Sequence, residues 1–243
     1  MNILIYTITR NSSNYIQNYY DQVIKIPGLF PQHKFFLSIY ENDSEDNTVD
    51  IIQSLDFSQF EDFCFKSEKL DLNFYGSIQN AERVDILAKC RNKAIFDCGF
   101  LEKCDYVMML ESDIYYLPDA VRKLLNFNSK YNLDADIVSS TYFWSQADRI
   151  LYDTWGTRID DQSRGSFLKP DWIDKEYDSY YATCNGICLF KAEPFKRGIK
   201  YSGYNSRLNT FDCDTAVICE EFRRFGYDKI YINYKSKVFV SWY

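Results

Sequence analysis

The chain has 243 residues, of which 26% are charged, and a formal net charge of −7. This length suits one large α/β domain or two small ones, and the 46% of hydrophobic residues can fill a sizeable core. The negative charge argues against a nucleic-acid partner, because binding to a phosphate backbone needs clustered Lys and Arg.

The composition also limits the kinds of site. Aromatic residues make up 18% of the chain, which suits interior packing and sugar-binding clefts, although an AT-rich genome would favour the same residues. The eight cysteines form no Cys-x-x-Cys pair, which argues against a structural zinc site, and His33 is the only histidine. No stretch reaches the roughly 18 apolar residues of a membrane span, and residues 1–8 lack the pattern of a signal peptide. We therefore expect no membrane span and a cytoplasmic location.

The first half of the chain alternates between strands and helices. Apolar runs predict strands over residues 2–8 and 35–40, a short strand over 63–65, and a buried strand over 105–110. Helices are expected after Ser12 or Ser13 up to Pro27-Gly28, around Val49 to Leu55, over 81–98, and from Pro118 onward. Alternating strands and helices are typical of βαβ units and a parallel sheet.

The second half has a different character. Strands are predicted over 136–140, 184–190, 229–233 and 237–242, and a helix over 213–225 that Gly226 ends. Residues 141–180 are aromatic and irregular, and a loop region of that length inside a compact domain is usually functional. We interpret 1–243 as a single domain, with a nucleotide-sugar-binding half (1–125) and an acceptor-binding half (126–243).

The run 106–110 leads directly into Glu111-Ser112-Asp113. Two acids at the carboxyl end of a buried strand lie where open α/β sheets bind their ligands. Alternate carboxylates at this edge can share a cation and the diphosphate that the cation neutralises. An ordinary acidic turn after a strand is the alternative.

The order of several short motifs resembles the capsule-associated α-1,3-mannosyltransferase family (glycosyltransferase family 69) and related viral glycosyltransferases. The resemblance implies the GT-A fold, a single Rossmann-like domain with a central, mostly parallel mixed sheet flanked by helices. It also implies a metal-dependent nucleotide-sugar donor and a glycan acceptor. The matching motifs are Thr9-Arg10-Asn11-Ser12, the acidic loop 40–48, Arg91-Asn92-Lys93-Ala94, Glu111-Ser112-Asp113, residues 152–158, Cys184-Asn185-Gly186-Ile187, and residues 213–222.

On the donor side, the resemblance and the residue chemistry give the same candidates. Asp113 is the expected ligand of Mn²⁺ or Mg²⁺, and Glu111 would face the ribose or a metal-bound water. Relatives add a histidine near the C-terminus, and this chain has none there, so the other metal ligands stay open. The remaining donor-binding candidates are Arg10, Asn11, Arg83 and Arg91 near the diphosphate, and Glu41 and Asp43 near the nucleobase and ribose. A surface salt bridge for Arg91, and a helix-capping loop for Glu41 and Asp43, are the alternatives.

On the acceptor side, Trp155 would stack on a sugar face, while Arg158 and Asp160 would bind sugar hydroxyls. An aromatic core beneath a long loop is the alternative for Trp155. Asn185 and Gly186 either let the acceptor approach the backbone or form a tight bend.

The catalytic candidates are Asp214 and Asp153. Asp214 begins the late helix, where inverting GT-A enzymes place the base that takes a proton from the acceptor hydroxyl. In a retaining enzyme the same residue would orient the acceptor, and helix capping is the alternative that involves no catalysis.

These inferences predict a glycosyltransferase that moves mannose, rhamnose or a similar sugar from a GDP- or UDP-sugar to a glycan hydroxyl. A carbohydrate-binding module without catalysis is the main alternative. A sugar-nucleotide nucleotidyltransferase is disfavoured, since that class needs a Gly-rich phosphate loop and residues 10–13 contain no glycine.

Overall fold

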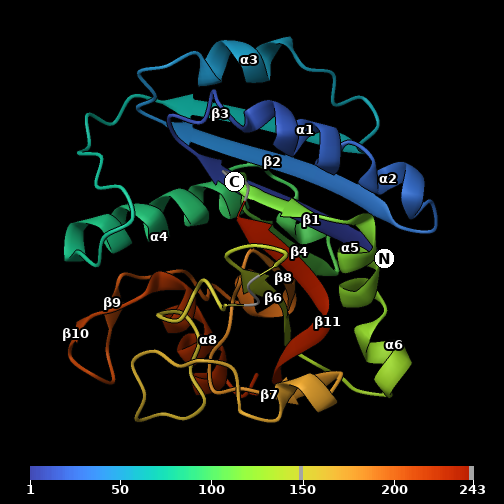
Figure 1. The fold of residues 1–243 in the computed structure, drawn as a ribbon. Helices are drawn as coiled ribbons and strands as arrows, with labels where there is room; N and C mark the ends of the chain where they lie inside the picture. The colour runs from blue at the N-terminus through green and yellow to red at the C-terminus, as the bar shows by residue number, and fades with distance from the viewer. Residues whose placement is uncertain (148–149, 241–243) are drawn as a thin grey trace.

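The computed structural model describes residues 1–147 and 150–240, and a nine-stranded sheet forms its centre (Figure 1). The strand order is β3-β2-β1-β4-β8-β6-β11-β5, with β7 pairing to β11, and a separate hairpin pairs β9 with β10. The strands are β1 (Asn2–Thr9), β2 (Lys34–Asn42), β3 (Asp62–Glu68), β4 (Tyr106–Leu110), β5 (Ile114–Tyr116), β6 (Ile137–Phe143), β7 (Tyr177–Ser179), β8 (Ile187–Lys191), β9 (Tyr204–Asn205), β10 (Thr210–Phe211) and β11 (Ile230–Val240).

Strands β3, β2, β1 and β4 are mutually parallel. Strand β8 runs antiparallel to both of its neighbours, β4 and β6, so β6 has the same direction as β4. The sheet is therefore mixed and mostly parallel, as predicted. The carboxyl ends of β1, β4 and β6 and the start of β8 consequently meet at one edge.

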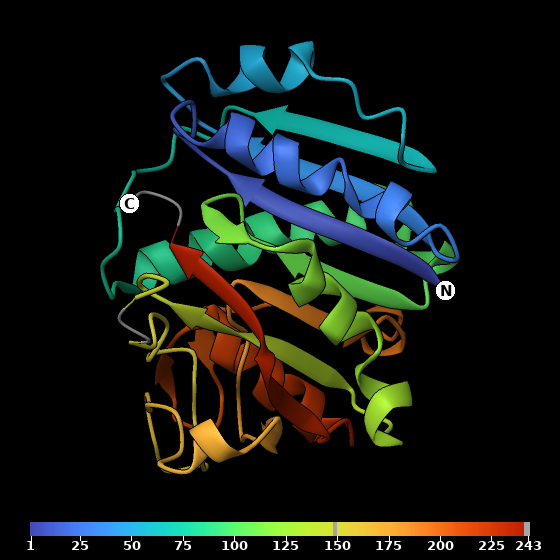
Figure 2. The same ribbon diagram turned by 45° about the vertical axis from the view of Figure 1, so that its right-hand side comes forward.

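Helices cover both faces of the sheet (Figures 1 and 2). Those on one face contribute to one hydrophobic core and those on the other face to a second core. The first set is α1 (Ile16–Val23), α2 (Ile26–Leu29), α3 (Thr48–Ser54), α5 (Pro118–Leu125) and α6 (Phe127–Tyr131). The second set is α4 (Ala81–Phe96), α7 (Glu193–Lys196) and α8 (Asp214–Arg224), and the short 3₁₀ helices are Leu101–Lys103 and Trp172–Asp174.

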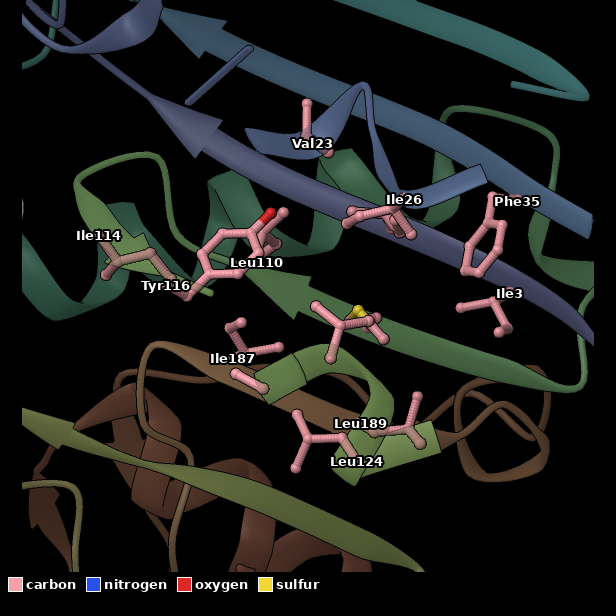
Figure 3. Packing of buried hydrophobic residues seen from close by; sticks show 14 of the residues in the cluster. Ile3, Val23, Ile26, Phe35, Leu110, Ile114, Tyr116, Leu124, Ile187 and Leu189 are labelled. Atoms are coloured by element: carbon pink, nitrogen blue, oxygen red, sulfur yellow. The ribbon is translucent and has the colours of Figure 1, made fainter. Parts of the chain in front are cut away.

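The central strands are apolar at successive positions because both of their faces are buried. In β1, Ile3 joins the core beneath α1 and α2, whereas Leu4 joins the core beneath α4 and α8. Figure 3 shows Ile3, Leu110 and Ile26 among the packed side chains of the first core.

The structure corrects three local predictions. Helix α1 begins after Tyr15, and the Ser12 carbonyl, not its side chain, accepts from the backbone N–H of Tyr15 and Ile16. Pro27-Gly28 lies inside α2, since proline is tolerated in the first turn of a helix. The two predicted C-terminal strands are one strand, β11, with an irregularity between residues 232 and 237; residues 241 and 242 of that prediction lie outside the described residues.

Gly186, just before β8, provides a test of packing at the sheet edge. Its φ is +59°, and an added Cβ would lie 2.6 Å from Val238 Cγ2. We expect Gly186→Ala to lower the free energy of unfolding by about 2–4 kcal/mol, through backbone strain and a steric clash. Urea denaturation measures the loss. Gly76→Ala is the matched control, with φ +57° and no atom within 4 Å, and it should cost only about 1 kcal/mol. Equal losses in the two variants would contradict the packing explanation.

Candidate active site

A cavity of about 590 Å³ opens at the edge where β1, β4 and β6 end. This is where open α/β sheets bind ligands. Its lining residues come from segments far apart in the sequence: residues 8–11, Tyr15, Asn42, 73–79, Arg83, Ile86, Leu87, Arg91, 111–113, Tyr142, 152–155 and 213–215.

Arg91 occupies the inner wall of this cavity and bridges two acids. Its Nε donates to Asp214 Oδ2 at 2.8 Å, and its Nη2 donates to Glu111 Oε1 at 3.2 Å. The guanidinium also contacts Met109 Sδ and lies 5.7 Å from the Tyr201 ring centroid. Arg91 is only 5% exposed, so the surface salt bridge considered for it does not describe its position.

Asp113 lies beside this bridge without a cationic partner at ion-pair distance among the described residues. Burial, and then the nearby Glu111 carboxylate, raise the pKa of Asp113 to about 7. Burial also raises the pKa of Glu111, although Arg91 opposes this effect. Asp113, which has no ion-pair partner among the described residues, fits a hard divalent cation, since such a cation prefers oxygen ligands. Within the described ranges, no group of three or more His, Cys, Asp or Glu side chains is placed to hold a metal ion, so a cation would need further oxygens from elsewhere.

Asp153 also lines the cavity, near enough to Glu111 and Asp214 for their charges to act on it. Its Oδ1 accepts a hydrogen bond from the Gly156 N–H at 2.9 Å. Burial raises the pKa of Asp153 to about 6, and the hydrogen bond from Gly156 opposes this effect. A carboxyl group with a pKa near neutral pH is suited to accept or release a proton.

The loop between β3 and α4 forms one wall of the cavity and is anchored by Asp43. The Asp43 carboxylate accepts from the backbone N–H groups of Leu70, Asp71 and Leu72. Burial would raise the pKa of Asp43, but these bonds and one from the Asn42 side chain hold it below its usual value.

Arg10 lies under the same loop. It donates to the carbonyls of Leu72 and Asn73, and its guanidinium lies 5.4 Å from the Phe74 ring centroid. Arg10, Asn11 and Arg83 all line the cavity, where the donor-side prediction expected them. Arg83 also donates to the Gly76 carbonyl and so helps to fix the loop.

Glu41 and Asp43 do not line the cavity. Glu41 is 1% exposed, and its two oxygens accept from the Ser44 N–H and the Ser67 hydroxyl. Both acids therefore hold loops in place, and direct contact with a nucleobase or ribose does not fit their positions.

Arg158 is fully buried beneath the cavity and does not face it. Its guanidinium pairs with Asp212 at 2.6 Å and with Glu220 at 3.1 Å. This network connects the segment carrying Asp153 to the start of α8, which carries Asp214. Arg158 thus positions two cavity segments, and a direct contact with a sugar hydroxyl would require access that it does not have.

Of the other acceptor-side candidates, one lines the cavity and the others do not. Trp155 lines the cavity. Asp160 is exposed in a turn, where it accepts from the N–H groups of residues 162 and 163, and it does not line the cavity. Asn185 is fully buried and hydrogen-bonded to Thr157 and Thr183, and Gly186 packs against β11. Asn185-Gly186 therefore forms the tight bend.

The structure adds lining residues that the sequence analysis did not single out, notably Tyr15, Tyr142, Thr215 and the loop 73–79. The loop could have been noticed from its aromatic residues just before Asn80, which caps α4 by accepting from two backbone N–H groups. No pattern in the sequence distinguishes Tyr142 from its aromatic neighbours.

The sequence matches the family described as cryptococcal mannosyltransferase 1 over residues 2–221. The chain belongs to this family. The predicted resemblance to capsule-associated mannosyltransferases is confirmed, and the family to which the chain belongs is one of glycosyltransferases. Among curated proteins, no sequence matches the chain.

Several solved structures have a similar fold. A structure of GalNAc-T7 with UDP, GalNAc and Mn²⁺ has a TM-score of 0.63 at 12% identity and covers 99% of this chain and 44% of that one. The mannosyltransferase PcManGT from Pyrobaculum calidifontis, in complex with GDP-Man and Mn²⁺, has a TM-score of 0.59 at 10% identity. This match covers 98% of the present chain and 56% of the PcManGT chain. TarS from S. aureus has a TM-score of 0.59 at 12% identity. This match covers 99% of the present chain and 37% of the TarS chain. The similarity confirms the GT-A fold, and the chain spans about a third to just over half of the lengths of these proteins.

Arg91 provides a test of the buried ion bridge. We expect Arg91→Met to lower the free energy of unfolding by about 3–5 kcal/mol, because the buried Asp214 carboxylate and the partly exposed Glu111 carboxylate lose their partner. Urea denaturation at neutral pH measures the effect. Lys89→Met, on the same helix, removes an exposed ion pair to Asp85 and should change stability by about 0.5 kcal/mol or less. A loss in Arg91→Met no larger than that control would contradict the importance of the bridge.

Asp153 gives a pH-dependent prediction. Its pKa is raised in the folded state, so its ionised form destabilises the fold above about pH 6, and this cost is lost as the pH falls through that value. Asp153→Asn should therefore raise the free energy of unfolding by about 1–3 kcal/mol at pH 8, and the gain should shrink towards pH 4. Urea denaturation in the presence of a chelator measures it. Asp56→Asn is the control, because hydrogen bonds from Ser58 lower the pKa of Asp56 and the effect should have the opposite sign at pH 8. A gain for Asp153→Asn that does not change with pH would refute the assignment.

Proposed function

We propose that this chain transfers a hexosyl group, with mannose the first candidate, from a nucleotide-diphosphate sugar to a hydroxyl of a glycan. The observation that carries the proposal is the set of charged groups in one cavity: Asp113 and Glu111, the Arg91–Asp214 ion pair, and Asp153. The glycosyltransferase family of the chain supports it.

The nucleoside is assigned to the part of the cavity near the ends of β1 and β2. Asn42, Phe74 and Tyr75 line this part and offer an amide and two rings to a base and a ribose. Arg10 and Arg83 lie at the same side of the cavity and would face the diphosphate, since Arg presents several N–H donors to phosphate oxygens.

Asp113, with Glu111 beside it, is the proposed holder of Mn²⁺ or Mg²⁺. Such an ion supplies Lewis-acid stabilisation of the charge on the departing nucleoside diphosphate. The fit rests on the raised pKa of Asp113 and on the lack of a cationic partner for it among the residues that the structure describes. The complexes of PcManGT and GalNAc-T7 with Mn²⁺ support a metal in this fold.

The acceptor hydroxyl is assigned to the region between Asp153, Asp214 and Trp155. Its oxygen forms the new bond to the anomeric carbon, the bond from that carbon to the diphosphate oxygen breaks, and the nucleoside diphosphate leaves with the electron pair. We assign the released proton to Asp153, whose pKa lies near 6. Arg91 holds Asp214 in place, so Asp214 is assigned to orient the acceptor.

Two other functions are less well supported. A carbohydrate-binding module has no use for a partly buried carboxylate such as Asp113, which forms no ion pair among the described residues. A nucleotidyltransferase would need a Gly-rich phosphate loop, and the lining segment after β1 contains none. Independently of these assignments, no described helix is long and apolar enough to cross a membrane.

Asp113→Asn tests the proposal. We expect sugar transfer to fall by at least about a hundredfold, because the site loses the carboxylate assigned to the metal. Transfer is measured as nucleoside diphosphate released from GDP-mannose and UDP-GlcNAc with a mixed glycan acceptor, and Mn²⁺-dependent binding of GDP and UDP is measured by calorimetry. Binding that depends on Mn²⁺ should be lost in the variant.

Asp160→Asn is the matched control, since this aspartate is exposed and lies outside the cavity. It should leave both readouts unchanged. Normal transfer by Asp113→Asn would refute the assigned site. Sugar binding without transfer in the wild-type protein, whatever the metal, would favour the carbohydrate-binding module.

A further inference from the structure

Tyr142 lies near the carboxyl end of β6 and lines the cavity. The ring rests on the bend at Gly186, where an added Cβ would come within 3.5 Å of it. The ring centroid of Tyr152 is 4.6 Å away on the other side. The side chain is 1% exposed, so its ring position is fixed by packing.

The Tyr142 hydroxyl has no hydrogen-bond partner in the part of the chain that the structure describes. Buried hydroxyl groups are nearly always hydrogen-bonded, because a buried donor without a partner costs free energy. Packing does not require the Tyr142 hydroxyl, since a phenylalanine ring would fill the same space. Because Tyr142 lines the cavity, a ligand oxygen can supply the partner that its hydroxyl lacks among the described residues.

The hydroxyl would act as the donor of that bond. Burial, and then the charges of Asp113 and Glu111, raise the pKa of Tyr142 far above neutral pH, so the hydroxyl keeps its proton. A ligand oxygen with a free lone pair is therefore the complementary group.

The position in the sheet indicates which part of the ligand this is. The nucleoside is assigned to the ends of β1 and β2, and the metal ion that would neutralise the diphosphate is assigned to the acids after β4. Strand β6 is two places beyond β4 in the sheet, which corresponds to about 10 Å. The next group along a nucleotide-diphosphate sugar, at roughly that distance, is the sugar itself.

We propose that the Tyr142 hydroxyl donates a hydrogen bond to a hydroxyl of the sugar that is transferred. This inference rests on the proposed function and names a donor-sugar contact within the same cavity. Tyr152, packed against Tyr142, also lines the cavity and offers an aromatic face to the same sugar ring.

Tyr142→Phe tests the contact with a matched control elsewhere in the fold. Tyr116 on β5 is also buried, and its hydroxyl also lacks a partner among the described residues, but it lies in the core beneath α1 and outside the cavity. Each substitution removes one buried oxygen without changing the ring. Neither variant should have a lower Tm than the wild-type protein in the absence of ligand, since no hydrogen bond is lost.

Calorimetry with Mn²⁺ then compares GDP-mannose with GDP and UDP-GlcNAc with UDP. We expect Tyr142→Phe to lower the affinity for the nucleotide sugar that the wild-type protein binds. The expected factor is about three- to tenfold, which is the range for one hydrogen bond. The corresponding nucleoside diphosphate should bind within about twofold of wild type. Tyr116→Phe should bind both ligands as wild type does.

Other outcomes separate the possibilities. Equal weakening of the nucleotide sugar and the nucleoside diphosphate would overturn the inference, since it would place the contact at the phosphates. Unchanged donor binding, with or without a higher KM for the acceptor, would also overturn it. If the wild-type protein binds nucleoside diphosphates but Tyr142→Phe has no effect on either donor, only this inference fails. If the wild-type protein binds neither GDP- nor UDP-linked ligands, the proposed function fails and this inference with it.

Discussion

The Arg91 bridge is the interaction on which the arrangement of the cavity depends. One guanidinium connects α4, the end of β4 and the start of α8, and Arg91 and Asp214 are separated by 123 positions in the sequence. Ion pairs out of contact with water stabilise a fold only when their geometry satisfies both partners, and breaking them leaves a buried charge uncompensated. The bridge therefore fixes Glu111 and Asp214 relative to each other, while Asp113 forms no ion pair with Arg91.

A second buried network has a complementary role. Arg158, Asp212 and Glu220 join the segment after Tyr152 to the start of α8. Together with the Arg91 bridge, this network holds α8 from two sides, so Asp153 and Asp214 face the same space although one lies in an irregular segment. A long aromatic segment can thus carry site residues outside the helices and strands, because ion pairs and isolated backbone hydrogen bonds, such as those between Arg158 and Ala182, hold it in place.

The sequence was most informative where periodicity or a long apolar run was present. Strands β1, β2 and β4, helix α4 and helix α8 follow from such patterns, and so does the placement of Asp113 and Glu111 at a sheet edge. Burial was not predictable from residue type: Arg158 and Glu41 have the chemistry of ligand-binding groups, yet both are enclosed by partners supplied from distant segments. Strand β5 and the β9–β10 hairpin are too short to produce a periodic signal. Tyr142 was hidden for another reason, since in a strand buried on both faces an aromatic residue gives no indication of which way it points.

The loop before α4 is attached firmly at its two ends and only lightly between them. Asp43 binds the backbone of residues 70–72, and Asn80 caps the helix that follows, whereas Phe74 and Ile78 at residues 73–79 are largely exposed. Apart from Tyr75, which packs against the core beneath α4, the side chains at residues 73–79 belong to neither core. A change in this one segment therefore alters the wall of the cavity to which the nucleoside is assigned, while the acidic side chains on the other segments stay in place.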